Sequence, residues 1–117
     1  MSVYIYYDAP QDISWNYTLN GSNATIGTGG NWQNPGNATN LGTSLSGAIT
    51  IPSTITYGDA SYNVTGIGQY AFYNCSNLIS IDLSGTQVTT IGQYAFYQCS
   101  NLTSIDLGNS VTTIGFA

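Results

Sequence analysis

Few residues of this 117-residue chain could carry acid–base, nucleophilic or metal chemistry. The chain contains no Lys, Arg, His or Glu, and its charged side chains are five aspartates: Asp8, Asp12, Asp59, Asp82 and Asp106. Histidine bases, lysine Schiff bases and Ser–His or Cys–His nucleophile pairs are therefore excluded within the chain. Two cysteines without a histidine do not make a zinc site, and nucleic-acid binding is not expected without cations to neutralise phosphates. We expect no catalytic residue, no metal ligand and no cofactor.

Two of the aspartates recur in the same local sequence, because Asp82 and Asp106 each follow a Ser-Ile pair. On adjacent strands their carboxylates would lie about 5 Å apart, a separation found in retaining glycosidases and usable in part of a calcium site. A glycosidase also needs a cleft, and calcium needs about six to eight oxygens, which Ser80 and Ser104 supplement poorly. A solvated ladder of Ser and Asp is the preferred interpretation, with both aspartates kept as candidate binding residues.

Four tyrosines recur in the same way and are the main candidate binding residues: Tyr70, Tyr73, Tyr94 and Tyr97. Within each repeat the two tyrosines are three residues apart, off the buried face of a predicted helical turn. Stacked repeats would collect the four rings into one outer patch. Tyrosine is favoured at binding surfaces because it combines contact area with a polar tip. The alternative is that each ring simply covers the neighbouring repeat.

Cysteines and sequons offer two weaker candidates. Cys75 and Cys99 occupy equivalent repeat positions; adjacent strands suit the Cα separation of a disulfide, but side chains that point the same way keep their Cβ atoms too far apart. A buried column of free thiols is preferred. Seven asparagines lie in N-x-S/T sequons: Asn16, Asn20, Asn23, Asn37, Asn63, Asn74 and Asn101. Because Asn101 matches Asn77, which has no sequon, its role is expected to be structural.

The candidate residues belong to an internal repeat. Residues 64–83 read VTGIGQYAFYNCSNLISIDL and residues 88–107 read VTTIGQYAFYQCSNLTSIDL, so seventeen of twenty positions are identical. A third copy begins at residues 111–117, and Ile49–Ser53 aligns with Ile81–Ser84 as the end of an earlier, degenerate unit. A period of this length with the pattern L-x-x-I-x-L is typical of leucine-rich solenoids.

Each repeat predicts one strand and one turn. Residues 78–83 alternate apolar and polar side chains, which indicates a strand with one solvated face. Residues 69–75 instead space their apolar side chains as one face of a helical turn. One repeat cannot bury its apolar row alone, so neighbouring repeats must stack.

The first half of the chain has a different pattern from that of the repeats. We predict a strand at residues 3–7, a hairpin at Asn20-Gly21, an irregular loop over residues 27–47 and a second hairpin between residues 54–57 and 62–65. The expected domains are an N-terminal β cap with a Gly/Asn-rich loop (1–63) and the repeats (64–117, divided into 64–87, 88–110 and the partial 111–117).

The pattern V-T-x-I-G-x-x-A-F-x-x-C-x-x-L-x-S-I-x-L resembles the BspA-like leucine-rich repeat family over residues 64–117. Residues 46–68 resemble the lead-in that precedes the first full repeat of such proteins, and residues 15–26 resemble their N-terminal hairpin less specifically. The resemblance implies a mainly β fold, a short right-handed leucine-rich-repeat solenoid with an N-terminal β-hairpin cap. It also implies surface adhesion or protein–protein recognition, and no catalytic activity.

The surface and the end of the array suggest where the chain acts. No apolar run reaches the roughly 18 residues of a membrane span, and the first residues lack the pattern of a signal peptide; an uncharged polar surface suits an extracellular protein or a virion. The uncapped C-terminal edge has no charged residues to discourage pairing, so a protein partner or self-association there is expected. We therefore expect a non-enzymatic structural or recognition module. The alternatives are a glycan- or calcium-binding surface domain and, remotely, a glycoside-processing enzyme that uses the aspartates.

Overall fold

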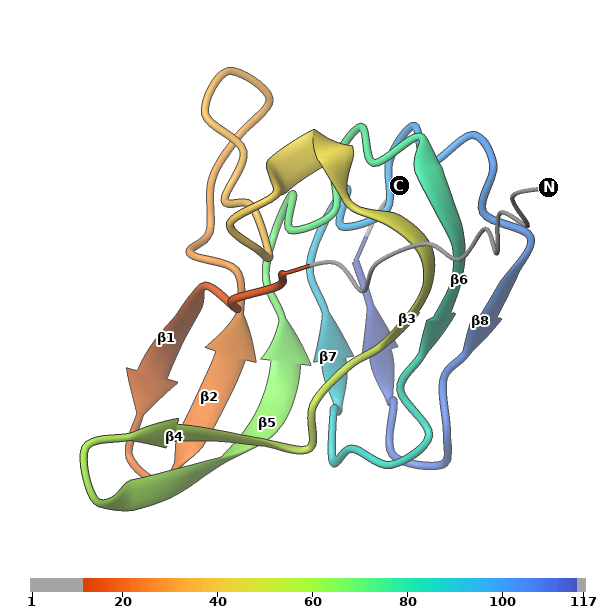
Figure 1. Ribbon diagram of the computed structural model, residues 1–117. Coiled ribbons are helices and arrows are strands. Elements are labelled where there is room, and N and C mark those ends of the chain that lie inside the picture. Colours follow the sequence, from red (N-terminus) through yellow and green to blue (C-terminus); the bar gives the residue numbers. More distant parts are fainter. Residues whose placement is uncertain (1–11, 116–117) are drawn as a thin grey trace, which may run out of the picture.

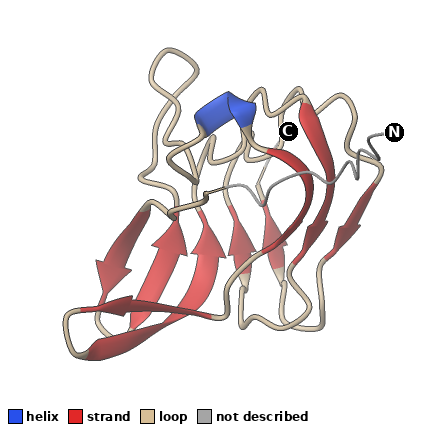
Figure 2. Cartoon of the chain, in the orientation of Figure 1, coloured by secondary structure: helices blue, strands red, loops and turns tan. Residues whose placement is uncertain are grey.

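The computed structural model describes residues 12–115 as two β-sheets joined by turns (Figure 1). The first sheet contains β1 (Tyr17–Asn20), β2 (Asn23–Ile26), β4 (Thr54–Tyr57), β5 (Ala60–Ile67), β7 (Thr90–Ile91) and β9 (Thr113–Ile114). The second contains β3 (Ser46–Thr50), β6 (Asn77–Asp82) and β8 (Ser104–Asp106). Among the described residues the helical content is one short 3-10 turn, η1 (Gly42–Ser44) (Figure 2). The predicted mainly β class is confirmed; the strand predicted at residues 3–7 lies outside the described residues.

Equivalent strands of successive repeats pair in parallel, with each residue beside its own copy. In the second sheet Ile81 pairs with Ile105, and Asp82 pairs with Asp106. The same sheet places Ile49 beside Ile81 on the other side, which confirms that Ile49 belongs to an earlier, degenerate unit. In the first sheet β5, β7 and β9 follow the same parallel register. The right-handed winding of the predicted solenoid stays a prediction.

Both predicted hairpins are confirmed. Strands β1 and β2 pair antiparallel around a turn at Gly21-Ser22, one residue later than the predicted Asn20-Gly21, and Gly21 has a φ of 62°. This positive φ is the conformation that a two-residue hairpin turn requires. Strands β4 and β5 pair antiparallel around Gly58 in the same manner. Strand β2 also pairs in parallel with β5, so the first hairpin continues the sheet that the repeats extend. That residues 1–63 form a separate cap stays a prediction.

The long loop before β3 is packed against the repeats. Ala38 and Leu45 are buried in the common core, and the Ala38 N–H donates to the Ala71 carbonyl at 2.7 Å. The predicted loop also ends earlier than residue 47, because β3 begins at Ser46. The loop therefore covers the first corner of the repeats, in agreement with its length, which exceeds that of ordinary unpacked connections.

The core consists of columns of identical side chains contributed by successive repeats. The rings of Phe72 and Phe96, at equivalent positions of successive repeats, stack with centroids 5.2 Å apart and an interplanar angle of 5°. Burial weakens towards the C-terminal end: Ile81 is 1% exposed but its copy Ile105 is 37% exposed. The last described repeat therefore leaves part of its inner face open.

The turn predicted as helical is not a helix. Residues 69–75 form a series of turns, because Tyr70 and Asn74 have φ values of 61°, and their copies Tyr94 and Gln98 have φ values of 56° and 60°. A right-handed helix cannot contain these left-handed residues. The i, i+1, i+4, i+7 spacing of apolar residues marks the inward face of this corner and does not report a helical backbone.

The left-handed residues direct alternate N–H groups towards the next repeat. The N–H groups of Ala71, Tyr73 and Cys75 bond locally, three residues back. The intervening N–H groups donate to the following repeat: Tyr70 to Gln93 (3.0 Å), Phe72 to Ala95 (2.7 Å) and Asn74 to Tyr97 (2.8 Å). The corner therefore has its own backbone hydrogen-bond ladder, which stabilises the stack as the strand ladders do.

The two cysteines lie in the core beside this corner and are free. The Cys75 thiol donates to the Gly42 carbonyl at 3.5 Å, and the Cys99 thiol donates to the Phe72 carbonyl at 3.1 Å. Burial, with a smaller contribution from Cys99, raises the pKa of Cys75 to about 12. Burial also raises the pKa of Cys99. Both thiols are therefore protonated at neutral pH and are poor nucleophiles there.

The phenylalanine column predicts unequal mutant effects. Phe72→Ala is expected to lower the free energy of unfolding by about 3–5 kcal/mol, because it removes a fully buried ring and leaves a cavity. Phe96→Ala is expected to cost less, because the Phe96 ring is only partly buried. Urea denaturation followed by circular dichroism measures both losses, and an equal or larger loss for Phe96→Ala would contradict this account.

The left-handed conformation of Gln98 predicts that glycine at this position is more stable than alanine. Gln98 is exposed and has a φ of 60°, a conformation in which a Cβ costs about 1–2 kcal/mol. We expect Gln98→Gly to be more stable than Gln98→Ala by about 1 kcal/mol. The same pair of variants at exposed Gln87, which lacks a positive φ, provides the control. At Gln87 the alanine variant should have a melting temperature equal to or higher than that of the glycine variant. A higher melting temperature for Gln98→Ala than for Gln98→Gly would disprove the left-handed conformation of the corner.

The thiols predict ordered labelling at pH 8. The variant Cys99→Ala retains only Cys75, and Cys75→Ala retains only the more exposed Cys99. Because Cys75 is more buried than Cys99 and burial raises its pKa to about 12, we expect it to react with an aromatic disulfide reagent more slowly than Cys99. In denaturant the two rates should become equal. Equal rates in the folded proteins would contradict the burial difference.

Candidate functional site

The corner ladder brings the four candidate tyrosines into one cluster, which we call the tyrosine quartet (Tyr70, Tyr73, Tyr94 and Tyr97). Ring centroids are 5.1 Å apart for Tyr70–Tyr73 and Tyr70–Tyr94. They are 5.6 Å apart for the stacked Tyr73–Tyr97 pair and 5.4 Å for the edge-on Tyr94–Tyr97 pair. Each ring therefore contacts two others, at separations typical of favourable aromatic pairs.

The quartet is not uniformly exposed. Tyr70 is only 8% exposed, whereas Tyr97 is 38% exposed, and Tyr73 and Tyr94 are intermediate. The prediction that all four rings lie on the outside is wrong for Tyr70, whose ring is buried against those of Tyr73 and Tyr94. Burial, followed by the proximity of Tyr94, raises the pKa of Tyr70. Tyr70 therefore anchors the cluster, and Tyr97 presents it to solvent.

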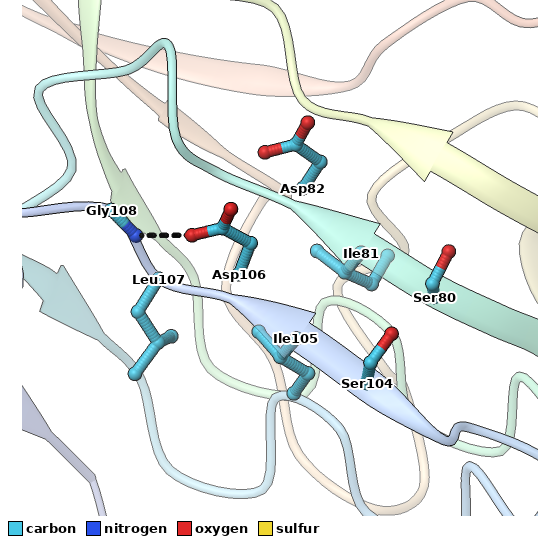
Figure 3. A pocket seen from close by; sticks show the side chains of 8 residues that line it. All are labelled: Ser80, Ile81, Asp82, Ser104, Ile105, Asp106, Leu107 and Gly108. Atoms are coloured by element: carbon cyan, nitrogen blue, oxygen red, sulfur yellow. Dashed lines mark hydrogen bonds between the residues drawn. The ribbon is translucent and has the colours of Figure 1, made fainter.

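The two candidate aspartates lie side by side on the second sheet. Ser80, Asp82, Ser104 and Asp106 project from the same side of β6 and β8, and Leu107 projects from the other (Figure 3). They line a shallow depression that continues around β8 to Leu107 and Gly108. The predicted ladder of Ser and Asp is therefore present.

Each carboxylate takes part in the turn that follows its strand. Oδ1 of Asp82 accepts the Ser84 N–H at 2.8 Å, and Oδ1 of Asp106 accepts the Gly108 N–H at 3.0 Å. Hydrogen bonds from the Ser84 hydroxyl and then from the Ser84 backbone hold the pKa of Asp82 below its ordinary value. Within residues 12–115 no group of three or more His, Cys, Asp or Glu side chains could hold a metal ion.

Asparagines and threonines add side-chain bonds between repeats. Asn101 donates to the Ser76 carbonyl at 2.8 Å, which confirms its predicted structural role. The threonine bonds were not foreseen from the sequence: Thr89 donates to the Thr65 carbonyl, and Thr112 donates to the Thr89 carbonyl. The recurring Val-Thr dipeptide was the sequence feature from which these bonds could have been predicted. These bonds fix the spacing of the repeats on which the quartet depends.

The described helical segment is far too short and polar to cross a membrane. A comparison with protein families matches residues 43–117 to the BspA type leucine-rich repeat region (6 copies). A comparison with curated proteins finds no match.

Two solved structures resemble the chain over 92% of its length. One is a leucine-rich repeat protein from Bacteroides ovatus, with 28% sequence identity and a TM-score of 0.60; the chain covers 25% of that protein. The other is a leucine-rich cell surface protein from Faecalibacterium prausnitzii, with 30% identity and a TM-score of 0.55; the chain covers 33% of it. The chain thus spans a quarter to a third of these proteins. Because the family match extends over more than half of its residues, the chain belongs to the BspA-type leucine-rich repeat family.

Proposed function

We propose that this chain is a non-enzymatic recognition module, a short solenoid that presents a repetitive surface to a protein partner in adhesion. The observation that carries the proposal is the tyrosine quartet, in which every ring contacts two others. The family match over residues 43–117 and the similarity to a leucine-rich cell surface protein support the same class of function.

The quartet suits recognition because it is ordered before any partner arrives. The backbone of the first corner is bonded to the next repeat through Tyr70 and Asn74, and the rings restrain one another. Ordering a side chain on binding costs roughly 0.5–1.5 kcal/mol, and this cost is largely avoided for rings already packed together. A rigid tyrosine surface also offers hydroxyl groups to a partner's polar atoms.

Charge limits the kind of contact that the surface makes. The chain has a formal net charge of −5 and no cation, so its own side chains supply only the negative half of any salt bridge. Asp82 and Asp106 form the second part of the proposed surface, a negative strip along β6 and β8. A partner with aromatic or hydrogen-bonding groups and some positive charge is the best match.

The place of action that we propose is a bacterial cell surface. One similar structure is a leucine-rich cell surface protein, and a surface of Ser, Thr, Asn and Tyr fits an exterior environment. This similarity favours the cell surface over a virion. Catalysis is not proposed, because the chain has no base other than aspartate and the aspartate pair is engaged in turns.

Immobilised collagen, a protein that carries positively charged side chains, provides a direct test. We expect the chain to bind it in biolayer interferometry, with affinity lowered about tenfold by Tyr97→Ser, because the exposed ring of the quartet is lost. Tyr57→Ser is the matched control: Tyr57 is 62% exposed and lies on β4, outside the quartet. A parallel glycan array tests the glycan alternative. Failure of the collagen surface to retain the chain, or equal losses for the two variants, would contradict the proposal.

A further inference from the structure

The fold sorts the seven N-x-S/T sequons of the chain by what their side chains contact. The Asn16 amide donates from Nδ2 to the Asn37 carbonyl at 3.1 Å, and the Asn101 amide donates to the Ser76 carbonyl at 2.8 Å. Oδ1 of Asn74 is buried and has no hydrogen-bond partner among the described residues. Because a sugar joins such a side chain at Nδ2, none of these three amides is freely presented to an enzyme.

The sequon at Asn37 is closed at its hydroxyl. Its third residue, Thr39, is 2% exposed, and the Thr39 hydroxyl accepts the Leu41 N–H at 3.2 Å. The other three sequon asparagines are exposed: Asn20, Asn23 and Asn63.

These three asparagines form one row across the first sheet. Asn20 pairs with Asn23 between β1 and β2, and Asn23 pairs with Asn63 between β2 and β5. Directly paired residues project from the same face of a sheet. The next residues of β2 and β5, Ala24 and Val64, are 1% and 0% exposed, so the row of amides lies on the outer face.

Asn20 differs from the other two by its place in the hairpin. Asn23 lies on β2, which is paired on both sides, and Asn63 lies on β5 between β2 and β4. Asn20 instead ends β1 and leads directly into the turn at Gly21-Ser22, and residues 18–23 are all exposed. Exposed loop tips are the places where enzymes most readily reach a folded chain. The sequon Asn20-Gly21-Ser22 is therefore the most accessible of the seven.

We propose that Asn20 is the acceptor of an N-linked sugar, which an asparagine glycosyltransferase transfers from a nucleoside diphosphate sugar. In this step Nδ2 of Asn20 attacks the anomeric carbon, and the bond between that carbon and the diphosphate oxygen breaks. The diphosphate leaves with the bonding electron pair, and Nδ2 releases one proton to the enzyme. Ser22 supplies the third-residue hydroxyl that the sequon requires. The inference does not rest on the tyrosine quartet or on the proposed adhesion.

The neighbouring asparagines limit the row to one sugar. Directly opposed side chains have Cβ atoms about 4.5–5.5 Å apart, so a sugar on Asn20 lies beside the Asn23 amide. This amide has both donors and an acceptor for sugar hydroxyl groups. The bulk of the attached sugar also blocks the approach of a second transferase to Asn23.

Transfer of glucose to the folded chain tests the assignment. The enzyme is an N-x-S/T glucosyltransferase supplied with UDP-glucose and first shown to modify synthetic peptides of residues 17–22 and 98–104, which contain the sequons of Asn20 and Asn101. In the folded chain we expect one glucose, at Asn20. Its transfer should be at least about tenfold faster than transfer to any other sequon, because the others react only after local opening. Intact mass counts the sugars, and chymotryptic peptides locate them, since the chain has no Lys or Arg for trypsin.

Substitutions in the same hairpin supply the controls. Ser22→Ala removes the Asn20 sequon and should abolish the modification, whereas Ser22→Thr keeps a hydroxyl and should retain it. Thr18→Ala removes the neighbouring Asn16 sequon from an exposed position and should leave the rate at Asn20 unchanged. A folded chain that takes no sugar at Asn20, comparable labelling of Asn101, or full labelling of Ser22→Ala at Asn20 would overturn the proposal.

Discussion

The structure depends on one constraint: every repeat must place its backbone in hydrogen-bonding register with an identical repeat. Parallel pairing in both sheets puts each residue beside its own copy, and the corner adds a third ladder through Tyr70, Phe72 and Asn74. Side chains therefore form columns of like residues. Phenylalanine stacks on phenylalanine and tyrosine on tyrosine, which gains contact area. The quartet is a direct product of this register.

The same constraint disfavours charged side chains in the repeats. Any charged residue in a repeat lies next to the same charge in the following repeat, about 4.8 Å away, where the two repel. Neutral polar residues avoid this repulsion. Threonine and asparagine also stabilise the stack, because their side chains donate hydrogen bonds to carbonyls of the preceding repeat. Aspartate recurs at one strand position, where its carboxylate accepts the N–H of the following turn. That local bond offsets part of the repulsion between Asp82 and Asp106.

A stack of this kind also has unequal ends. At the first end the loop before β3 bonds to the Ala71 carbonyl and buries Ala38, and the β1–β2 hairpin continues the sheet. In the last described repeat the apolar faces are more open, as the exposure of Ile105 and Ile114 shows. Burial of the columns therefore decreases along the stack.

The periodicity of the sequence by itself determined much of this protein: the repeats, their register, the phenylalanine column, the Ser and Asp ladder and both hairpins. These features follow from residue spacing and turn residues, which act over a few positions. The corner was decided only by the tertiary structure. Its apolar spacing matches a helical turn, but the N–H groups of Tyr70, Phe72 and Asn74 find their acceptors on the next repeat, so Tyr70 and Asn74 adopt the left-handed conformation that local preference disfavours. The burial of Tyr70 and the parallel pairing of β2 with β5 were equally hidden, because both depend on partners distant in sequence that no local pattern encodes.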